Sequence, residues 1–319
     1  MLRRLLFLLV VLFFLSGCAQ KQPIESDGLG PEDYDYSITH DELIRYYRIH
    51  IPASYEGDAT PLVIYVHGGA GNKRSAYVDG MDKMSDKHGF ILAAPEGTGE
   101  VKLGELRGNW NGGRWETGEC CETTDDVGFI SAMIDDIRGK FNIDERKVYA
   151  TGISNGGLMT NRLGCELADK IAAIAPVAPA AIMSDCFPSR PMPVFDVHGS
   201  ADPANPADGS EPSGIFGEGG LLHMPYKRMS PYQVVDSWKK INNCSDAVVE
   251  GYVNGGAECR IFNDCSGDAE VVLCMVEGMG HTYPCGSQYL PASLVGSVSH
   301  DISFNQIWEF FLNHPMPEE

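Results

Sequence analysis

The feature that most constrains this chain is a glycine-rich turn, Gly152-Ile153-Ser154-Asn155-Gly156-Gly157. The apolar run Val148-Tyr149-Ala150 before it predicts a strand, and the spacing of Leu158 and Leu163 after it predicts a helix. A turn this tight between strand and helix needs glycine at its flanking positions, and it lifts the serine hydroxyl clear of the backbone. The pattern therefore predicts Ser154 as a nucleophile at the mouth of a sheet. The alternative is a glycine-rich turn whose serine only caps the helix.

The rest of the chain alternates strand and helix signals. Strands are predicted at Tyr46–Ile51, Leu62–Val66, Phe90–Pro95, Ile171–Val177, Val194–Val197 and Val271–Val276, and helices at Asp126–Phe141, Pro231–Asn243 and Ile302–Asn313. The first of these helices has Asp125 or Asp126 as its N-cap. This alternation is typical of an α/β fold with a mostly parallel sheet and helices on both faces. Ligands of such sheets bind at the carboxyl ends of the strands.

A serine nucleophile needs a base, and the base needs a carboxylate to orient it. His281 lies on a glycine-rich loop just past the last predicted strand, and Asp202 lies on the loop after the strand Val194–Val197. We therefore predict Ser154, Asp202 and His281 as a catalytic triad. A surface-loop histidine and a turn carboxylate are the alternatives. Asp196, inside the strand, is a weaker rival for Asp202. Two other histidines, His67 and His198, each precede a glycine in a turn, and we interpret both as structural.

Hydrolysis through serine also needs two backbone N–H groups that stabilise an oxyanion. One is expected from Asn155, directly after the nucleophile, and the other from Gly69 in the loop His67-Gly68-Gly69-Ala70-Gly71, with Ala70 as its rival. The chain has no P-loop motif, and it lacks the paired Cys-x2-Cys or His-x3-His spacings of a zinc site. We therefore expect neither a metal nor an organic cofactor.

The N-terminus reads as an export signal. Two arginines precede eleven consecutive apolar residues, Leu5–Leu15, which suits a signal peptide and is too short to span a bilayer. Leu15-Ser16-Gly17-Cys18 resembles the lipobox of bacterial lipoproteins, so we predict a signal peptide at 1–17, a lipid on Cys18 and a flexible acidic tether over 18–40. The expected location is the cell envelope, at the outer membrane on its periplasmic or surface side. An ordinary signal peptide that happens to contain a cysteine is the alternative.

The charge of the chain limits which partners it can bind. With 24 basic and 44 acidic residues, the chain carries a formal net charge of −20. That balance argues against nucleic acid as a partner and against an anionic substrate in a basic groove.

Export makes the nine cysteines besides Cys18 candidates for disulfides, and their odd number leaves at least one without an intramolecular partner.

With these motifs in place, the chain resembles a family of secreted esterases of the carbohydrate esterase family 1 type. This family contains polyhydroxybutyrate-depolymerase-like and feruloyl-esterase-like enzymes. The matching segments are Tyr46–Tyr55, Pro61–Gly69, Trp110-Asn111, Cys120-Cys121, Asp125–Ile130, Gly152–Gly157, Ile174–Ala178, His198–Pro203, Gly280–Pro284 and Ile307–Phe311. The resemblance implies an α/β-hydrolase fold over residues 41–319, as a single catalytic domain, and a serine ester hydrolase with Ser154, Asp202 and His281 as its triad. It also implies disulfides from the Cys120/Cys121 pair to Cys165 or Cys186, and from Cys244 to Cys265.

The chain departs from this family pattern in three places, and all of them concern the substrate. The stretch Pro206–Ser230 is longer than usual, Tyr283 stands where the family commonly has tryptophan, and three cysteines (Cys259, Cys274 and Cys285) are extra. Aromatic side chains near the strand ends suit an aromatic acyl group or a sugar ring, so we predict substrate contacts from Trp110, Trp115, Phe216 and Tyr283. Core packing for the tryptophans, and a solvent loop around Phe216, are the alternatives.

Four functions follow, in order of preference. The first is hydrolysis of hydroxycinnamoyl or related esters of polysaccharides, and the second is a polyhydroxyalkanoate depolymerase or short-chain (acetyl) ester hydrolase. A serine peptidase and a non-catalytic glycan-binding lipoprotein come after them.

Overall fold

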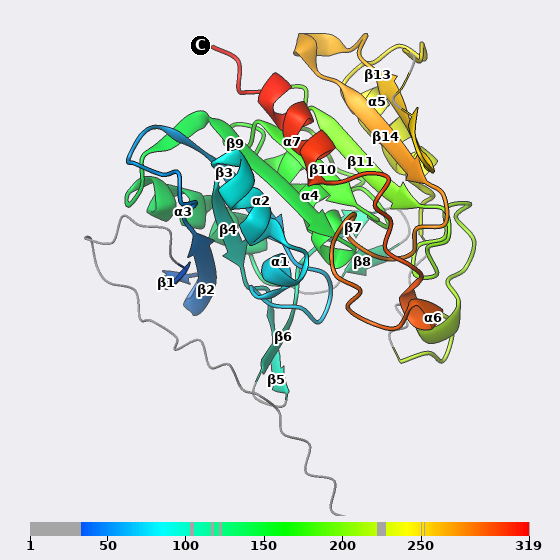
Figure 1. The fold of residues 1–319 in the computed structure, drawn as a ribbon, viewed down its shortest axis with the longest axis horizontal. Helices are drawn as coiled ribbons and strands as arrows, with labels where there is room; N and C mark the ends of the chain where they lie inside the picture. Colours follow the sequence, from blue (N-terminus) through cyan, green and yellow to red (C-terminus); the bar gives the residue numbers. More distant parts are fainter. Residues whose placement is uncertain are drawn as a thin grey trace, which may run out of the picture.

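The computed structural model describes residues 33–102, 105–115, 118–120, 123–221, 228–249, 251 and 253–318 (Figure 1). The predicted signal peptide at 1–17 and the predicted lipidation site Cys18 lie outside this range. Two layers of helices cover the two faces of one large sheet, as the alternation of strand and helix signals predicts.

Ten strands form the main sheet, in the order β1-β2-β4-β3-β9-β10-β11-β14-β13-β12. Their bounds are β1 Asp33–His40, β2 Leu43–His50, β3 Thr60–Val66, β4 Ile91–Pro95, β9 Ile143–Ile153, β10 Ala173–Val177, β11 Val194–Gly199, β12 Val253–Asn254, β13 Ala257–Phe262 and β14 Val271–Val276. The six central strands, β4 to β14 in this order, pair in parallel, and the strands at both edges pair antiparallel. All of the parallel strands therefore end at one edge of the sheet.

The helices divide between the two faces of this sheet. Their bounds are α1 Ser75–Val78, α2 Met81–His88, α3 Asp126–Arg138, α4 Asn155–Glu166, α5 Pro231–Ile241, α6 Ala292–Val295 and α7 Phe304–Asn313, with short 3-10 turns η1 Gly214–Phe216 and η2 Ser266–Asp268. Helices α3, α4 and α5 pack into the core on one face, and α1, α2 and α7 pack into the core on the other. The central strands are apolar on both sides because both of their faces are buried.

The predicted tether is wrong at its C-terminal end. Asp33–His40 is strand β1, which pairs antiparallel with β2 along its whole length. Its aromatic residues make it part of the fold, because Tyr34 is buried and the ring of Tyr36 stacks on that of Tyr47, 5.5 Å between centroids. The acidic residues between these tyrosines made the segment look solvated, although every second side chain faces the core.

Two small hairpins interrupt the chain between β4 and α3, where we predicted no strands. They are β5 Thr98–Lys102 with β6 Glu105–Asn109, and β7 Gly113–Trp115 with β8 Gly118–Cys120. Figure 1 shows the β5–β6 hairpin projecting beyond the other described strands. The connection between the hairpins, residues 110–112, runs back toward the core, where Trp110 is buried and its indole N–H donates to the His67 carbonyl at the end of β3.

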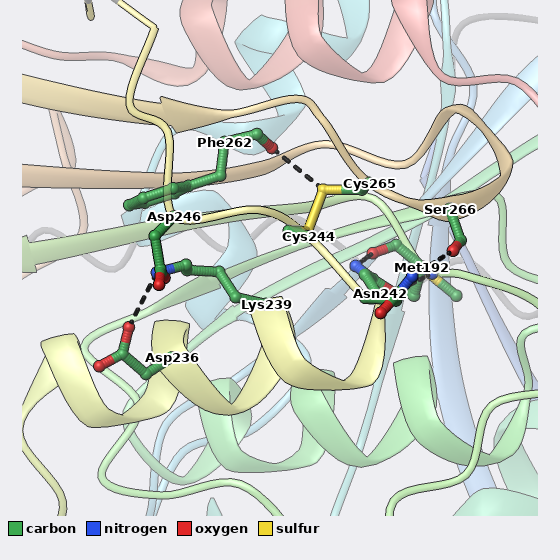
Figure 2. The surroundings of a disulfide bond; sticks show 10 residues. Met192, Asp236, Lys239, Asn242, Cys244, Asp246, Phe262, Cys265 and Ser266 are labelled. Atoms are coloured by element: carbon green, nitrogen blue, oxygen red, sulfur yellow. Dashed lines mark hydrogen bonds and ion pairs between the residues drawn. A yellow bond between two sulfur atoms is a disulfide. The ribbon is translucent and has the colours of Figure 1, made fainter.

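The structure contains three disulfides among its described residues. Cys244 bonds Cys265 as the family resemblance implied, beside α5 (Figure 2), and Cys259 bonds Cys274 across the β13–β14 pair. Cys165 bonds Cys186, so the implied link from the Cys120/Cys121 pair to either of them is wrong. Cys285 has a free thiol. Disulfides are typical of proteins that fold in an oxidising compartment outside the cytosol.

The described helices are too short or too polar for any of them to cross a lipid bilayer.

Candidate active site

Ser154 occupies a strained turn between β9 and α4. Its backbone lies at φ 60°, ψ −119°, a region that residues other than glycine rarely adopt. The flanking glycines are sterically required: a Cβ on Gly152 would lie 2.4 Å from the Val66 carbonyl oxygen, and one on Gly156 would lie 2.1 Å from the same atom. The tight approach of β3 to this turn therefore explains the glycine pattern, and the Ser154 side chain stays half-exposed.

His281 and Asp202 come from neighbouring strands and meet at the same edge of the sheet. Asp202 follows β11 and His281 follows β14, and these strands pair in parallel. The His281 Nδ1 atom lies 2.7 Å from Asp202 Oδ2, and both residues are buried. Two hydrogen bonds hold the His281 main chain against the segment that follows it. The His281 N–H donates to the Val295 carbonyl at 2.6 Å, and Tyr289 Oη donates to the His281 carbonyl at 2.9 Å.

The Asp202 carboxylate is fully engaged. Burial raises its pKa, but the His281 ring, the nearby His198 and the Asn205 N–H outweigh burial, so the pKa of Asp202 is lowered below its ordinary value. Oδ1 accepts the main-chain N–H groups of Ala204 at 2.8 Å and Asn205 at 2.9 Å. The carboxylate is therefore ionised at neutral pH, and its acceptor Oδ2 requires a proton on Nδ1 of His281. This leaves Nε2 of the imidazole as the proton acceptor, the tautomer that a general base needs.

The third predicted member, Ser154, lies two strands away from Asp202, at the end of β9. Its N–H donates to the Val177 carbonyl at the end of β10, at 2.9 Å. Among the described residues, no hydrogen bond joins the Ser154 hydroxyl to the His281 ring. Catalytic contacts of this kind are often long before a substrate is bound and tighten in the reacting complex. The three residues thus share one edge of the sheet, and the acid–base pair is already formed.

The loop after β3 lies directly against the elbow. A Cβ on Gly68 would be 3.7 Å from Ser154 Cβ, and one on Gly69 would be 3.6 Å from Asn155 Cβ. The N–H of Ala70 donates to Asn109 Oδ1 at 3.1 Å, whereas within the described part of the chain the N–H of Gly69 has no acceptor. Gly69 is therefore better suited than its rival Ala70 to stabilise an oxyanion, with Asn155 as the second predicted donor.

Two of the predicted substrate contacts are inside the protein. Trp110 is 0% exposed and its indole N–H donates to the His67 carbonyl at 3.0 Å, so core packing holds for this residue. Tyr283 is 2% exposed and its hydroxyl lies 3.0 Å from that of Thr151. Neither side chain is available to a substrate in this structure. Both predictions failed because an aromatic residue near a strand end fills the core as readily as a pocket.

The other two predicted contacts fall differently. Phe216, on η1, is buried and packs edge-on against the His281 ring, with 5.5 Å between ring centroids. It therefore touches the predicted catalytic base. Trp115 belongs to β7, and its side chain lies outside the described residues.

The histidines interpreted as structural are buried and neutral. Burial lowers the pKa of His67 to about 4, and its ring bridges the Gly68 carbonyl and the Gly97 N–H. Burial also lowers the pKa of His198, whose Nε2 donates to the Asn205 carbonyl at 2.7 Å. Asp196, the rival carboxylate, is buried inside β11, and in the described part of the chain neither of its oxygens has a hydrogen-bond partner. Burial raises its pKa well above the ordinary value, and the carboxylate that bonds the His281 ring is that of Asp202.

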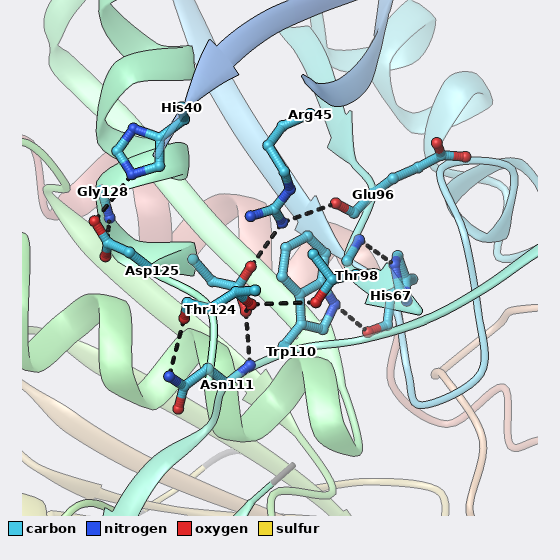
Figure 3. A network of polar contacts seen from close by, with 12 residues as sticks. His40, Arg45, His67, Glu96, Thr98, Trp110, Asn111, Thr124, Asp125 and Gly128 are labelled. Carbon is cyan, nitrogen blue, oxygen red and sulfur yellow. Dashed lines mark hydrogen bonds and ion pairs between the residues drawn. The ribbon is translucent and has the colours of Figure 1, made fainter. Parts of the chain in front are cut away.

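Sequence reasoning missed a buried polar network beside the elbow (Figure 3). Arg45 Nη2 lies 2.6 Å from Asp126 Oδ1, and Asp126 Oδ2 accepts the N–H of Asn111 at 2.7 Å. Trp110, the residue before Asn111, exchanges two hydrogen bonds with the side chain of Asn155. The signal was present in the Trp110-Asn111 pair that matched the family, but its partners are far away in the chain.

The described residues contain no group of three or more histidine, cysteine or acidic side chains that could hold a metal ion. The arrangement at the sheet edge provides a hydroxyl, an imidazole with an ionised carboxylate behind it, and backbone N–H groups.

The strand order, the turn at Ser154 and the positions of Asp202 and His281 define an α/β-hydrolase fold. An acetyl xylan esterase from Aspergillus awamori has the same fold, with a TM-score of 0.59 at 16% identity over 88% of this chain and 99% of that one. No protein-family model matches the chain.

Among the proteins that are similar in sequence are two enzymes. Feruloyl esterase B of Piromyces equi is 31% identical over 242 residues, which are 73% of this chain and 42% of that protein. Poly(3-hydroxyalkanoate) depolymerase C of Paucimonas lemoignei is 26% identical over 129 residues, 40% of this chain and 30% of that one. The chain thus spans less than half the length of these two relatives. Their names match the two kinds of enzyme that the sequence resembles, which confirms the predicted resemblance.

Proposed function

We propose that this protein is a serine ester hydrolase that acts through an acyl-enzyme, with Ser154, His281 and Asp202 as its triad. The observation that carries this proposal is the 2.7 Å bond between His281 Nδ1 and Asp202 Oδ2 at the sheet edge where the strained turn presents Ser154. A structural aspartate would not need a buried histidine as its partner, and a capping serine would not need a strained backbone.

The mechanism follows from these positions. His281 Nε2 takes the proton of the Ser154 hydroxyl as the oxygen attacks the ester carbonyl, and Asp202 stabilises the resulting imidazolium. The N–H groups of Gly69 and Asn155 hold the oxyanion of the tetrahedral intermediate. When the C–O bond breaks, the imidazolium returns its proton to the leaving alcohol. Water then attacks the acyl-enzyme as His281 Nε2 takes its proton. When the acyl C–O bond to Ser154 breaks, the imidazolium returns this proton to the serine oxygen and the carboxylic acid leaves.

We further propose that the substrate is a hydroxycinnamoyl or related ester of a polysaccharide. The support is the similarity to a feruloyl esterase, which is higher in identity and in coverage of this chain than the similarity to the poly(3-hydroxyalkanoate) depolymerase. The strongly acidic composition, with a net charge of −20, favours a neutral ester over an anionic one. A polyhydroxyalkanoate or short-chain ester is the second candidate, supported by the depolymerase similarity.

We propose a location in the bacterial cell envelope, with a lipid on Cys18 as the membrane anchor. The basic start, the apolar run and the lipobox-like Leu15–Cys18 support it. The three disulfides support export in general. Expression of the full chain in a bacterial host, followed by mass spectrometry of the N-terminal peptide, tests it: a peptide that begins at an unmodified residue other than Cys18 would refute the anchor.

The function is tested with purified protein and a panel of methyl ferulate, p-nitrophenyl acetate and polyhydroxybutyrate films. Wild type should cleave methyl ferulate with the highest kcat/KM, and Ser154→Ala should lower kcat by about 10⁴-fold or more with an unchanged melting temperature. Ser237→Ala is the matched control, since Ser237 is half-buried on α5 and its hydroxyl donates to the Gln233 carbonyl at 2.9 Å, a contact within the helix. A fluorophosphonate probe should label wild type and Ser237→Ala but not Ser154→Ala. Ester hydrolysis that survives in Ser154→Ala would refute the proposal.

A further inference from the structure

The segment Asn109–Asn111 touches both halves of the proposed oxyanion hole. These halves come from distant parts of the chain: the loop 67–71 after β3, and Asn155 at the start of α4. Backbone donors stabilise an oxyanion only if their spacing is held in advance, because reorganisation during the reaction would cost the energy that they supply. Some part of the protein must therefore fix the spacing between the two halves of the oxyanion hole.

Two contacts of the segment reach the loop after β3. Asn109 Oδ1 accepts the Ala70 N–H at 3.1 Å, and the Trp110 indole N–H donates to the His67 carbonyl at 3.0 Å. Gly69 lies between these two anchor points, and a Cβ added to it would come within 3.1 Å of Asn109 Oδ1. The position of the Gly69 N–H is thus set from both sides by this segment.

Two more contacts reach the other half. The Trp110 N–H donates to Asn155 Oδ1 at 2.8 Å, and Asn155 Nδ2 donates to the Trp110 carbonyl at 3.1 Å. This pair of bonds uses both polar groups of the amide and fixes its direction. Asn155 is buried, so water does not compete for these bonds.

The segment itself is anchored below. The Asn111 N–H donates to Asp126 Oδ2 at 2.7 Å, and Asp126 pairs with the buried Arg45 (Figure 3). Arg162 Nη1 also donates to the Asn111 carbonyl, at 2.9 Å. Asp126 lies on α3, Arg45 on β2 and Arg162 on α4, so elements other than the loop after β3 hold the segment in place.

We infer that Asn109, Trp110 and the side chain of Asn155 are positioning residues that hold the two oxyanion donors, the N–H groups of Gly69 and Asn155, at a fixed spacing. This inference rests on the proposed function. The side chains act through the donors and do not touch the substrate. Trp110 thus has a role in the reaction, although it is not the substrate contact that the sequence suggested.

The test compares Asn155→Ala with Asn161→Ala. Both residues are buried on α4, and both side chains make hydrogen bonds; those of Asn161 join the Ala181 carbonyl and the Trp238 indole N–H, away from the oxyanion hole. Asn155→Ala should lower kcat on p-nitrophenyl acetate about 10- to 100-fold with little change in KM, less than the 10²- to 10³-fold cost of removing an oxyanion donor. Asn161→Ala should lower the melting temperature to a similar extent but keep kcat.

A second variant keeps the inference testable if Asn155→Ala does not fold. Asn109→Ala removes the contact to the other half at a half-exposed position and should lower kcat in the same range. Because either change already releases one donor from the other, the double variant should lose less than the product of the single losses. Affinity for a trifluoromethyl ketone, which forms an oxyanion with Ser154, should fall in parallel with kcat/KM.

The outcomes separate the two proposals. If wild type hydrolyses esters and Ser154→Ala does not, but Asn155→Ala and Asn109→Ala keep their kcat, the positioning role is refuted and the proposed function stands. Equal losses of kcat in Asn155→Ala and Asn161→Ala, or multiplicative losses in the double variant, would also refute it. If wild type shows no ester hydrolysis and no labelling by fluorophosphonate, the proposed function fails, and the positioning role fails with it.

Discussion

Replacing Asp202 by asparagine tests the acid–base pair with minimal change in shape. Oδ1 of Asp202 accepts two main-chain N–H groups, from Ala204 and Asn205, while Oδ2 accepts one N–H, from His281. An asparagine keeps only one oxygen. Because each hydrogen bond contributes about 1 kcal/mol and an N–H facing two other donors is repelled, the amide oxygen stays with Ala204 and Asn205. Its NH₂ group then points at His281.

That orientation forces the wrong tautomer on His281. Nδ1 must become the acceptor, so the proton moves to Nε2, and the ring can no longer take the proton of Ser154. The corresponding change in serine proteases lowers kcat by about 10⁴-fold, which equals about 5.5 kcal/mol in the barrier. We expect the same loss for Asp202→Asn, with KM nearly unchanged, because the side chain does not touch the substrate.

The assay measures kcat and KM on methyl ferulate and p-nitrophenyl acetate, with circular dichroism to check folding. Asp196→Asn is the matched control: this neighbouring carboxyl is buried, and among the described residues neither of its oxygens has a hydrogen-bond partner, so its amide should leave kcat unchanged. The reasoning is refuted if Asp202→Asn keeps kcat within about tenfold of wild type, a change too small for a lost general base. An equal loss in Asp196→Asn would refute it as well.

Two further predictions concern stability. The pKa of His67 is lowered to about 4 in the folded protein from an ordinary value of 6.5, so the unfolded chain binds a proton first as the pH falls. The free energy of unfolding of wild type should therefore drop by about 3 kcal/mol between pH 6.5 and pH 4. Denaturant titrations of His67→Asn at the two pH values should show a smaller drop. A pH dependence identical to that of wild type would contradict the buried neutral ring. The Cys165–Cys186 disulfide closes a sequence separation of 21 residues, so the double variant Cys165→Ser/Cys186→Ser should lose about 3 kcal/mol of unfolding free energy. Peptide mapping without reduction should recover this pair, and a link from Cys120 or Cys121 to either cysteine would count against the structure.

Much of the fold could be predicted from the sequence, because apolar runs and helix-capping residues are local patterns along the chain. Buried parallel strands are continuous apolar runs, so the predicted strand Val271–Val276 recurs as β14 with the same ends, and Leu62–Val66 recurs within β3. Asp125 as N-cap of α3 is confirmed, with its side chain accepting the Gly128 N–H. The short strands β5–β8 and the acidic β1 were missed, because polar or brief segments have no periodic signal strong enough to distinguish them from loops.

The sequence alone also indicated the chemistry of the site, since the turn around Ser154 is a local motif and the order of serine, aspartate and histidine is readable along the chain. The tertiary structure decided which side chains share a neighbourhood. It pairs Asp202 rather than Asp196 with His281, joins Cys165 to Cys186, and turns Trp110 into the core against His67. The two faces of a strand, the partner of a cysteine and the contacts of the 109–111 segment depend on residues tens of positions away, and only the packing of the folded chain brings those residues together.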